Sequence, residues 1–209
     1  FEGDVAWQSN VAAGGSDIRS WSASCYFKVT EDTTDGYNGL FDPNTNDQEA
    51  IYLLDYKLQM YNPDTVIQGN YPSFTEANNL TDKWIFTHVD VVITNEEEGT
   101  AIIFCYIGNQ LTRDACTDKG GPGVITGTDG EEITLTPNGL CLFGPTEVDL
   151  GDIEEGWETI VYGAGRAGST GTLYEYKGPL GMVAFYNGQL NADTVLDNWD
   201  STRGSYYIT

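Results

Sequence analysis

Residues 83–112 read KWIFTHVDVVITNEEEGTAIIFCYIGNQLT, and the two halves of this segment differ in pattern. In the first half, apolar side chains recur at odd positions from Ile85 to Ile93. Side chains of a β-strand point to opposite faces with a period of two, so the odd-numbered set can enter a core. Residues 95–99 supply a charged turn that ends in glycine, and residues 101–107 resume as a β-rich run with apolar residues on both faces. The segment predicts a long central hairpin that packs against a second sheet and is partly covered on its other side.

The 209-residue chain shows no composition break that would mark a linker, so one domain spanning residues 1–209 is predicted. It carries 9 Lys plus Arg against 32 Asp plus Glu, a formal net charge of −23. This charge excludes nucleic acid and anionic membrane surfaces as partners, and it suits cations, neutral sugars or simple solubility. No run approaches the roughly 20 apolar residues of a membrane span, so no membrane insertion is expected.

The cysteines and one glycosylation signal favour a secreted, extracellular protein. The chain starts at Phe1 rather than Met, which favours a processed mature form or a fragment. Four cysteines and a sequon at Asn79 favour an oxidising compartment. Four cysteines allow three disulfide pairings. The pairs favoured, from the position of two of the residues at the end of the predicted hairpin, are Cys105–Cys116 and Cys25–Cys141.

Short alternating runs separated by Gly, Pro, Asn and Asp recur along the chain and predict some eleven to thirteen strands. The clearest lie at residues 20–30, 39–42, 50–61, 132–144, 159–163 and 172–176, with a flexible loop at 163–171. The run at residues 50–61 is a candidate pair of strands, with one face formed by Tyr52, Leu54, Tyr56, Leu58 and Met60. Residues 191–199 alone resemble a helix, with Asn191 or Asp193 as its cap. The pattern predicts an all-β fold, a two-sheet antiparallel jelly-roll sandwich with one short helix near the C-terminus.

Three segments, in this order, resemble the concanavalin A-like lectin/glucanase superfamily, and within it the laminin-G-like domains. Residues 22–29 (SASCYFKV) are similar to the opening strand of that family. Residues 84–109 are similar to its hairpin, which reads W-x-H-V-A-V-T followed by Y-V-N-G. Residues 178–199 (GPLGMVAFYNGQLNADTVLDNW) are similar to its closing strand and short helix. The resemblance implies two curved antiparallel sheets, with a ligand often held at the concave face or the rim loops.

The resemblance leaves the function open, because this fold hosts lectins, adhesion modules, glycoside hydrolases and polysaccharide lyases. Retaining glycosidases need two carboxylates about 5 Å apart, and the nearest acidic run is residues 149–155. Gly151 weakens a strand there, so a solvated acidic loop is favoured. Lyases of this fold use basic partners that are missing beside residues 26–28. The residues therefore favour a protein that is not an enzyme.

A calcium site is the more natural use of the acidic charge. Asp42, Asn44 and Asn46 place oxygen ligands at positions 1, 3 and 5 of a short loop, the spacing that lets a loop wrap a hard cation. The glycine at position 6 and the glutamate at position 12 of an EF-hand are missing. The two interpretations are a weak extracellular Ca²⁺ site and a plain Asx-turn loop.

Two groups of residues are candidates for ligand binding. Phe86, His88 and Asp90 share the even-numbered face of the hairpin's first strand, where the polar pair could bind sugar hydroxyls. The alternative is a histidine satisfied by a neighbour within the sandwich, and the residue pattern favours it. Tyr61 and Tyr71 belong to a long irregular segment, and tyrosine suits both saccharide stacking and protein interfaces.

The leading hypothesis is a secreted, non-catalytic carbohydrate-binding or adhesion module, with Ca²⁺ as its one candidate cofactor. Its partner would be a glycan or an extracellular or cell-surface protein. One alternative is a structural subunit of an extracellular filament, sheath or coat that self-assembles through edge strands at residues 5–7 and 205–208. The lesser alternative is a polysaccharide hydrolase or lyase.

Overall fold

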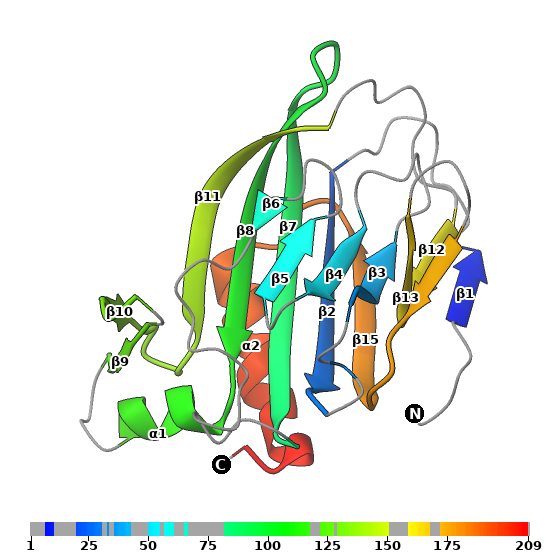
Figure 1. Ribbon diagram of the computed structural model, residues 1–209. Helices are drawn as coiled ribbons and strands as arrows, with labels where there is room; N and C mark the ends of the chain where they lie inside the picture. Colours follow the sequence, from blue (N-terminus) through cyan, green and yellow to red (C-terminus); the bar gives the residue numbers. More distant parts are fainter. Residues whose placement is uncertain are drawn as a thin grey trace.

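The computed structural model describes residues 7–10, 20–30, 33, 36–42, 50–54, 57–60, 65–66, 82–117, 122–127, 129–150, 159–167 and 172–208. Two antiparallel sheets lie face to face (Figure 1). This confirms the predicted two-sheet sandwich. None of the helices among the described residues has the length and apolar character needed to cross a bilayer.

The predicted hairpin forms the middle of a five-stranded sheet. The strand order is β11 (Cys141–Asp149), β8 (Thr100–Gly108), β7 (Trp84–Asn95), β2 (Trp21–Lys28) and β15 (Leu180–Asn187). The strands β7 and β8 pair from Phe86 opposite Gly108 to Asn95 opposite Thr100. Bulges interrupt both outer strands, between Phe143 and Thr146 in β11 and between Leu180 and Val183 in β15. The prediction of a long central hairpin is therefore confirmed.

The facing sheet has the order β1 (Trp7–Asn10), β12 (Thr159–Tyr162), β3 (Asn38–Asp42), β4 (Ile51–Leu54), β5 (Lys57–Met60) and β6 (Thr65–Val66). The predicted faces of residues 50–61 are corrected. Ile51 pairs with Met60 and Leu53 with Leu58, so odd positions of β4 share a face with even positions of β5. A hairpin turn between the two strands changes the parity that one continuous strand would keep.

Two short hairpins complete the strands. They are β9 (Val124–Thr126) with β10 (Glu132–Thr134), and β13 (Ala164–Ala167) with β14 (Thr172–Glu175). The predicted loop at residues 163–171 is therefore wrong for Ala164–Ala167.

The main core lies between the two sheets. The odd-numbered residues of β2, β7 and β8 fill it from one side, and Leu40, Phe41 and the paired residues of β4 and β5 fill it from the other. Ile85, Val89 and Val91 are fully buried, and Ile93 packs against the core from its edge. Trp21 stacks on Phe185 with ring centroids 5.4 Å apart. The odd-numbered face is thus buried as the alternation predicted.

A helix covers the opposite, even-numbered face of the same sheet. Helix α2 (Ala192–Thr202) lies behind the lower half of β7 and β8 in Figure 1. The Asn191 side chain caps it by accepting from the backbone N–H of Thr194 at 2.8 Å, as predicted. The residues that form this second core are Tyr26, Phe86, Tyr106, Leu140, Val195, Trp199 and Ile208. A side chain at Gly108 would collide with Leu140 and crowd Trp199, so only glycine admits this indole.

Two short helices were not predicted. Helix α1 (Gln110–Thr117) begins directly after β8, where Asn109 and Thr112 cap it reciprocally. At eight residues it is too short to show a clear helical period in the sequence. A 3₁₀ helix, η4 (Arg203–Tyr206), stands where a C-terminal edge strand was expected, so that edge strand is wrong.

The predicted disulfides are also wrong, because all four cysteines are free buried thiols. In sheet register Cys25 faces Thr87, which faces Ile107, which faces Cys141. Three strand spacings of about 4.8 Å separate the two cysteines by about 14 Å, whereas bonded cysteines need Cα atoms about 4.4–6.8 Å apart.

Cys105 and Cys116 each have a partner of their own. Cys105 Sγ is 3.7 Å from Thr87 Oγ1, inside the sandwich. Cys116 Sγ donates to the Thr136 carbonyl at 3.4 Å and accepts from the Gly123 N–H at 3.3 Å. The position of Cys105 and Cys116 near the end of the hairpin therefore does not bring them into a disulfide bond.

Burial protects these thiols, and the protein is predicted to resist alkylation until it unfolds. Burial raises the pKa of Cys105 to about 12 and raises the pKa values of Cys25 and Cys141. Since the thiolate is the reactive form, iodoacetamide at pH 8 should leave the native protein unmodified. Mass spectrometry after treatment in guanidinium without reductant should show four modified cysteines; two disulfides would give none.

The same burial sets the sign of an alkaline effect. Thiols of the unfolded chain ionise above about pH 9, while buried Cys105 stays neutral to a pKa of about 12. The unfolded state therefore releases protons first, and the free energy of unfolding should fall as the pH rises from about 9 toward 12. Urea titrations at pH 7.5, 9 and 10.5 check this.

Candidate functional site

Phe86, His88 and Asp90 lie on the even-numbered face of β7, beneath α2. Phe86 and His88 are fully buried, and Asp90 is 1% exposed. Phe86 packs against Trp199 with ring centroids 5.4 Å apart. The chain's own helix therefore occupies the place that a saccharide would need, and the interpretation of His88 as an internally satisfied residue is the one that fits.

Ser24, His88 and Asp90 form a buried chain of hydrogen bonds. Ser24 Oγ and His88 Nδ1 are 2.7 Å apart, and His88 Nε2 donates to Asp90 Oδ1 at 3.2 Å. Asp90 Oδ1 also accepts from the backbone N–H of Leu190 at 3.1 Å. These are the residue types of a nucleophilic triad, but the serine has no exposed surface through which a substrate could reach it. Leu190 lies in the connection from β15 to α2, so its hydrogen bond to Asp90 holds that connection against the sheet.

The remaining predicted site residues are only partly described. Asp42 ends β3 and is 2% exposed. The other predicted calcium ligands Asn44 and Asn46, the tyrosines Tyr61 and Tyr71, and the sequon residue Asn79 all lie outside the described residues. Within the described ranges, no three His, Cys, Asp or Glu side chains come together as a metal site. The calcium and glycosylation sites therefore stay predictions.

Two acidic residues of β11 were missed as a pair. Glu147 faces Ile102 and Asp149 faces Thr100, so both stand on the even-numbered face of the sheet, two residues apart. Both are exposed. The Glu-Val-Asp alternation was the signal for this pair, and the neighbouring Gly151 obscured it because it favoured a loop.

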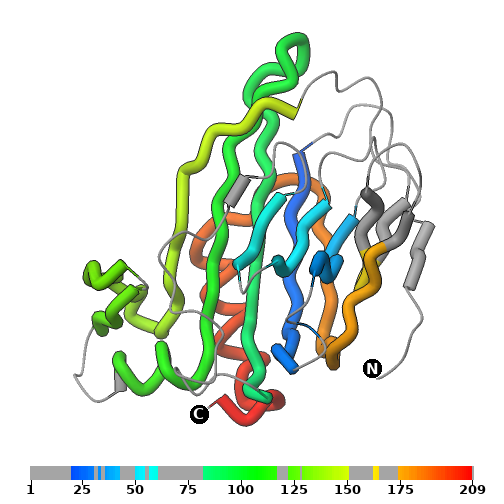
Figure 2. Tube along the Cα trace, viewed as in Figure 1, coloured from blue at the N-terminus to red at the C-terminus, as the bar shows by residue number. Residues whose placement is uncertain are grey.

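A groove of about 520 Å³ lies at the end of the sandwich where β7 begins, and it is a further candidate site. Figure 2 shows the C-terminal turn, the start of β7 and helix α1 together at this end. Three parts of the chain form the walls: the paired ends of β2 and β7, helix α1, and the C-terminal turn. The lining residues are Lys28, Asp82, Lys83, Trp84, Gln110, Leu111, Asp114, Tyr206, Tyr207 and Ile208.

Two groove residues have a backbone conformation that is rare for side chains other than glycine. Asp82 has φ 62° and Tyr207 has φ 59°, and among the described residues no other non-glycine residue has a positive φ. A left-handed backbone conformation at a non-glycine residue lowers the stability of the fold by about 1–2 kcal/mol. Surrounding contacts must offset that cost for the conformation to persist. Such positions cluster at functional sites, and both of those described here line one groove.

Tyr207 is displayed at the rim of this groove by residues that are themselves anchored. It is 85% exposed, while the next residue, Ile208, is 2% exposed. Before it, Tyr206 stacks on buried Tyr26 with ring centroids 3.8 Å apart. Gly181 leaves room for that stack, because a side chain there would collide with the Tyr206 ring. The exposed ring of Tyr207 therefore stands on a fixed base.

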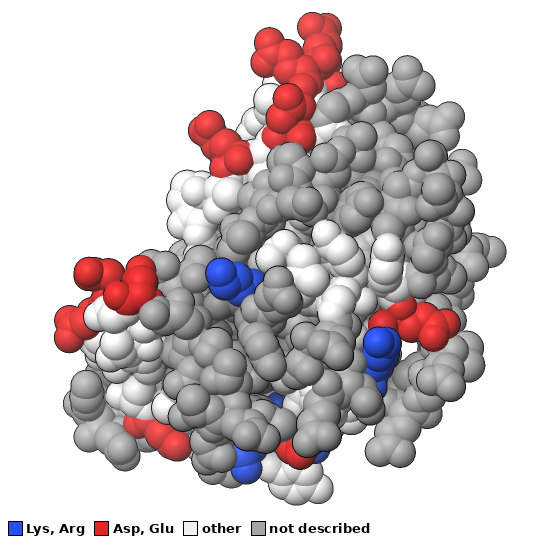
Figure 3. Space-filling model, in the orientation of Figure 1, with Lys and Arg blue, Asp and Glu red and all other residues white. Residues whose placement is uncertain are grey.

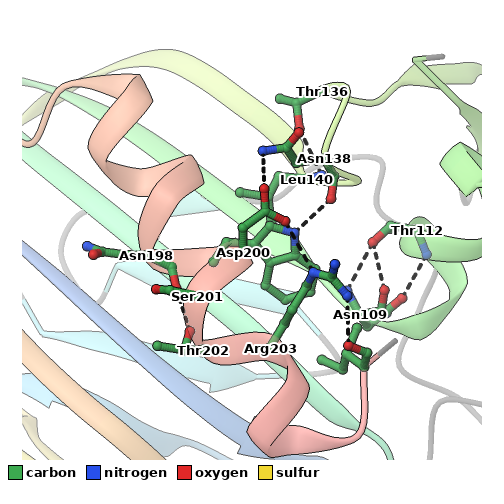
Figure 4. A network of polar contacts seen from close by, with 12 residues as sticks. Asn109, Thr112, Thr136, Asn138, Leu140, Asn198, Asp200, Ser201, Thr202 and Arg203 are labelled. Carbon is green, nitrogen blue, oxygen red and sulfur yellow. Dashed lines mark hydrogen bonds and ion pairs between the residues drawn. The ribbon is translucent and has the colours of Figure 1, made fainter.

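A polar network fixes the C-terminal turn and α2 to the rest of the sandwich (Figure 4). Asn138 donates to Asp200 Oδ2 at 2.6 Å, and its carbonyl accepts from Trp199 Nε1 at 2.7 Å. Arg203 bonds both Asp200 Oδ1, at 3.2 Å, and the Ile208 carbonyl, at 3.0 Å. The groove wall that carries Tyr207 is thus tied to both α2 and the β10–β11 turn.

The groove has a balanced charge, unlike the rest of the chain. Lys28 and Lys83 line it together with Asp82 and Asp114, whereas the chain as a whole carries −23. The Lys28 ammonium lies 5.0 Å from the centroid of the Trp84 ring, so it is held by a cation–π contact. Gln110 donates to Asp114 Oδ1 at 2.6 Å across one turn of α1. An aromatic ring, hydrogen-bonding groups and a neutral charge together suit a polar, uncharged ligand.

Few features of the sequence point to this groove. Residues 205–208 were expected to form an edge strand, and Asp82, Lys83 and residues 110–117 carry no pattern that places them beside the C-terminus. The groove assembles from four segments spread between residues 28 and 208, so only the fold brings them together.

No protein-family model matches the sequence, and no curated protein matches it. Solved structures do match. Domains LG4-5 of the mouse laminin alpha1 chain are 15% identical, with a TM-score of 0.40 over 90% of this chain and 40% of that chain. The binding domain of botulinum neurotoxin serotype D/C is 14% identical, with a TM-score of 0.44 over 89% of this chain and 37% of that chain.

A third match is botulinum neurotoxin type C, which depends on interaction with two ganglioside molecules to enter cells. It is 16% identical, with a TM-score of 0.42 over 89% of this chain and 36% of that chain. The chain thus spans about two fifths of the length of the solved chains it matches. At these identities the likeness concerns the fold alone.

The structural role of the buried hydrogen bonds among Ser24, His88 and Asp90 is testable by removing the Asp90 carboxylate. Asp90→Ala would leave the His88 ring and the Leu190 N–H without a buried acceptor, which should lower the free energy of unfolding by about 2–4 kcal/mol. The matched control is Asp197→Ala on the exposed side of α2, expected within about 0.5 kcal/mol of the parent. Urea denaturation followed by tryptophan fluorescence measures both. Equal stabilities for the two variants would contradict a fastening role.

Proposed function

We propose that the protein is an extracellular, non-catalytic glycan-binding module whose ligand lies in the groove beside Tyr207. The observation that carries the proposal is an anchored, 85% exposed tyrosine held at φ 59° over a groove with balanced charge. An exposed aromatic ring on a strained but fixed backbone is costly for stability alone. It is useful when a ligand's apolar face covers it.

The groove supplies both kinds of contact that a saccharide needs. The Tyr207 ring offers an apolar face for a pyranose ring, and its hydroxyl offers a polar end. Asp82 and Asp114 accept hydrogen bonds from sugar hydroxyls, and Lys83 and Gln110 donate to them. Neutral sugars fit best, because the net charge of −23 opposes the approach of polyanions.

Calcium is proposed as a cofactor of this module, bound at Asp42, Asn44 and Asn46. The alternating oxygen ligands support it, as does the position of Asp42 at the end of β3. Secretion is proposed with it, on the strength of the sequon at Asn79 and the strongly acidic composition.

Self-assembly is the second candidate function, and one observation favours it. Strand β1 stands at the outer end of the six-stranded sheet order, next to β12. An edge strand can pair with a second copy of the chain. A single particle of about 23 kDa in light scattering, at all concentrations tested, would contradict assembly.

Removal of the exposed ring tests the glycan proposal. On an array of neutral oligosaccharides, the parent should bind a defined set, and Tyr207→Ala should lose at least about 10-fold in affinity while its melting temperature is unchanged, since the ring is exposed. Tyr207→Phe should retain most of the binding, because the apolar face remains. The exposed residue Leu142, which does not line the groove, provides the control Leu142→Ala. No binding by the parent, or equal losses in Tyr207→Ala and the control, would contradict the proposal.

Chelation tests the calcium proposal separately. After treatment with a chelator and dialysis, calorimetric titration with Ca²⁺ should give saturable heat and a rise in melting temperature. Asp42→Asn should abolish the heat, because it removes the charged ligand of the predicted set. The absence of heat in the parent would end the proposal for calcium and leave the groove proposal unaffected.

A further inference from the structure

Among the described residues, helix α2 covers only about half of the length of the even-numbered face of the five-stranded sheet. Strand β7 has 12 residues, a length of about 40 Å, whereas α2 has 11 residues, a length of about 16 Å. The connection to α2 crosses the sheet at Asp90, where the Leu190 N–H bonds the carboxylate. In Figure 1 none of the helices formed by the described residues lies behind the part of β7 and β8 that extends from there to the hairpin tip.

The uncovered half carries a continuous apolar strip. Val92 faces Ile102 across β7 and β8, and Phe104 is the next residue along this face of β8. All three are half-buried. Leu142 of β11 stands opposite Tyr106, the residue that follows Phe104 on this face of β8, in the row of His88 at the border of the half that α2 covers; it is 45% exposed, a high value for an aliphatic side chain. The other half of the same face packs against helix α2. An apolar strip of this kind therefore indicates a surface that binds a partner.

The rim of this strip is acidic. Glu96, Glu97 and Glu98 form the exposed hairpin tip, and Glu147 and Asp149 stand on the same face of β11. A groove of about 440 Å³ runs between these strands, lined by Thr94, Thr100, Ala101, Ile102, Glu147, Val148 and Asp149. Figure 3 shows acidic side chains gathered at the tip of the hairpin. No Lys or Arg occurs in β8, in β11 or in residues 90–99.

These features define the chemistry of one occupant. The apolar strip needs aliphatic side chains at helical spacing, because the lower half of the same face already accepts a helix through Val195 and Trp199. The acidic rim needs positive charges at the edges of that helix. An anionic membrane surface would be repelled by the same carboxylates.

We propose that the upper even-numbered face of the five-stranded sheet, from Val92 to Leu142, docks a basic amphipathic helix of a partner protein. The helix lies beyond α2 on the same face, with its aliphatic stripe on Val92, Ile102 and Phe104. Its lysines or arginines meet Glu147 and Asp149 at the edge of β11. This surface is at the opposite end of the hairpin from the Tyr207 groove, so the two sites are independent.

Three synthetic helices test the proposal by fluorescence anisotropy with the full chain. The first carries Leu at i, i+3, i+4 and i+7 with Lys at the flanking positions; the second has Gln in place of Leu, and the third has Glu in place of Lys. The first should bind saturably in 0.15 M salt, and the other two at least about 10-fold more weakly. Equal affinity for the Leu/Lys and Gln/Lys peptides would mean that charge alone accounts for the binding, and it would overturn the proposal. The absence of saturable binding of the Leu/Lys peptide would also overturn it.

Matched variants locate the contact. Glu147→Lys and Leu142→Lys should each weaken binding of the Leu/Lys peptide at least about 10-fold, because one reverses the rim charge and the other places a like charge on the strip. Glu132→Lys makes the same charge change on exposed β10 and should weaken it far less. Tyr207→Ala should leave peptide binding unchanged. Equal effects of Glu147→Lys and Glu132→Lys would overturn the proposal, and thermal melts confirm that all variants are folded.

Discussion

Trp199 of α2 reaches the five-stranded sheet at a place where β8 has no side chain, over Gly108. It is fully buried, it packs on Tyr26 and Phe86, and its Nε1 donates to the Asn138 carbonyl at 2.7 Å. The contact joins a large apolar area to a satisfied polar end, which is the arrangement in which a buried indole stabilises most. The C-terminal turn that carries the candidate groove depends on this contact, because α2 and η4 hold that turn in place.

The same contact explains why the even-numbered face of β7 is structural, which is the alternative that the residue pattern favoured for His88. Once α2 lies on the sheet, His88 and Asp90 lose access to solvent, and their polar groups must be satisfied internally. Ser24 from the neighbouring strand partners His88 Nδ1, and Leu190 from the connection partners Asp90 Oδ1, while Asp90 Oδ2 has no hydrogen-bond partner among the described residues. A buried polar chain of this kind fixes one position of the connection, because a shift would leave several groups unpaired. A serine, a histidine and an aspartate, which in a sequence can indicate catalysis, thus serve here to hold the connection from β15 to α2 against the sheet.

Local pattern was enough to predict the hairpin, the cap at Asn191 and the division of the chain into two sheets, since each follows from a few neighbouring residues. It was not enough for the cysteines, because their separation is set by strand order: Cys25 and Cys141 share a row of the sheet but lie three strands apart. Local sequence pattern could not predict the groove either, because the groove also depends on how distant segments come together. Tyr207 and Asp82 meet only after β7 and the C-terminal turn have come to one end of the sandwich.

The two candidate surfaces differ in charge because of where the few cations fall. Lys28 and Lys83 stand at the end of the hairpin where β7 begins, and they neutralise the carboxylates beside them. The other end has three consecutive glutamates at the tip and no cation in the strands that lead to it. Screening confines each of these fields to about 8 Å at physiological salt, whereas β7 is about 40 Å long. A neutral ligand at one end and a basic helix at the other would therefore bind without competing, and one chain could join a glycan to a protein.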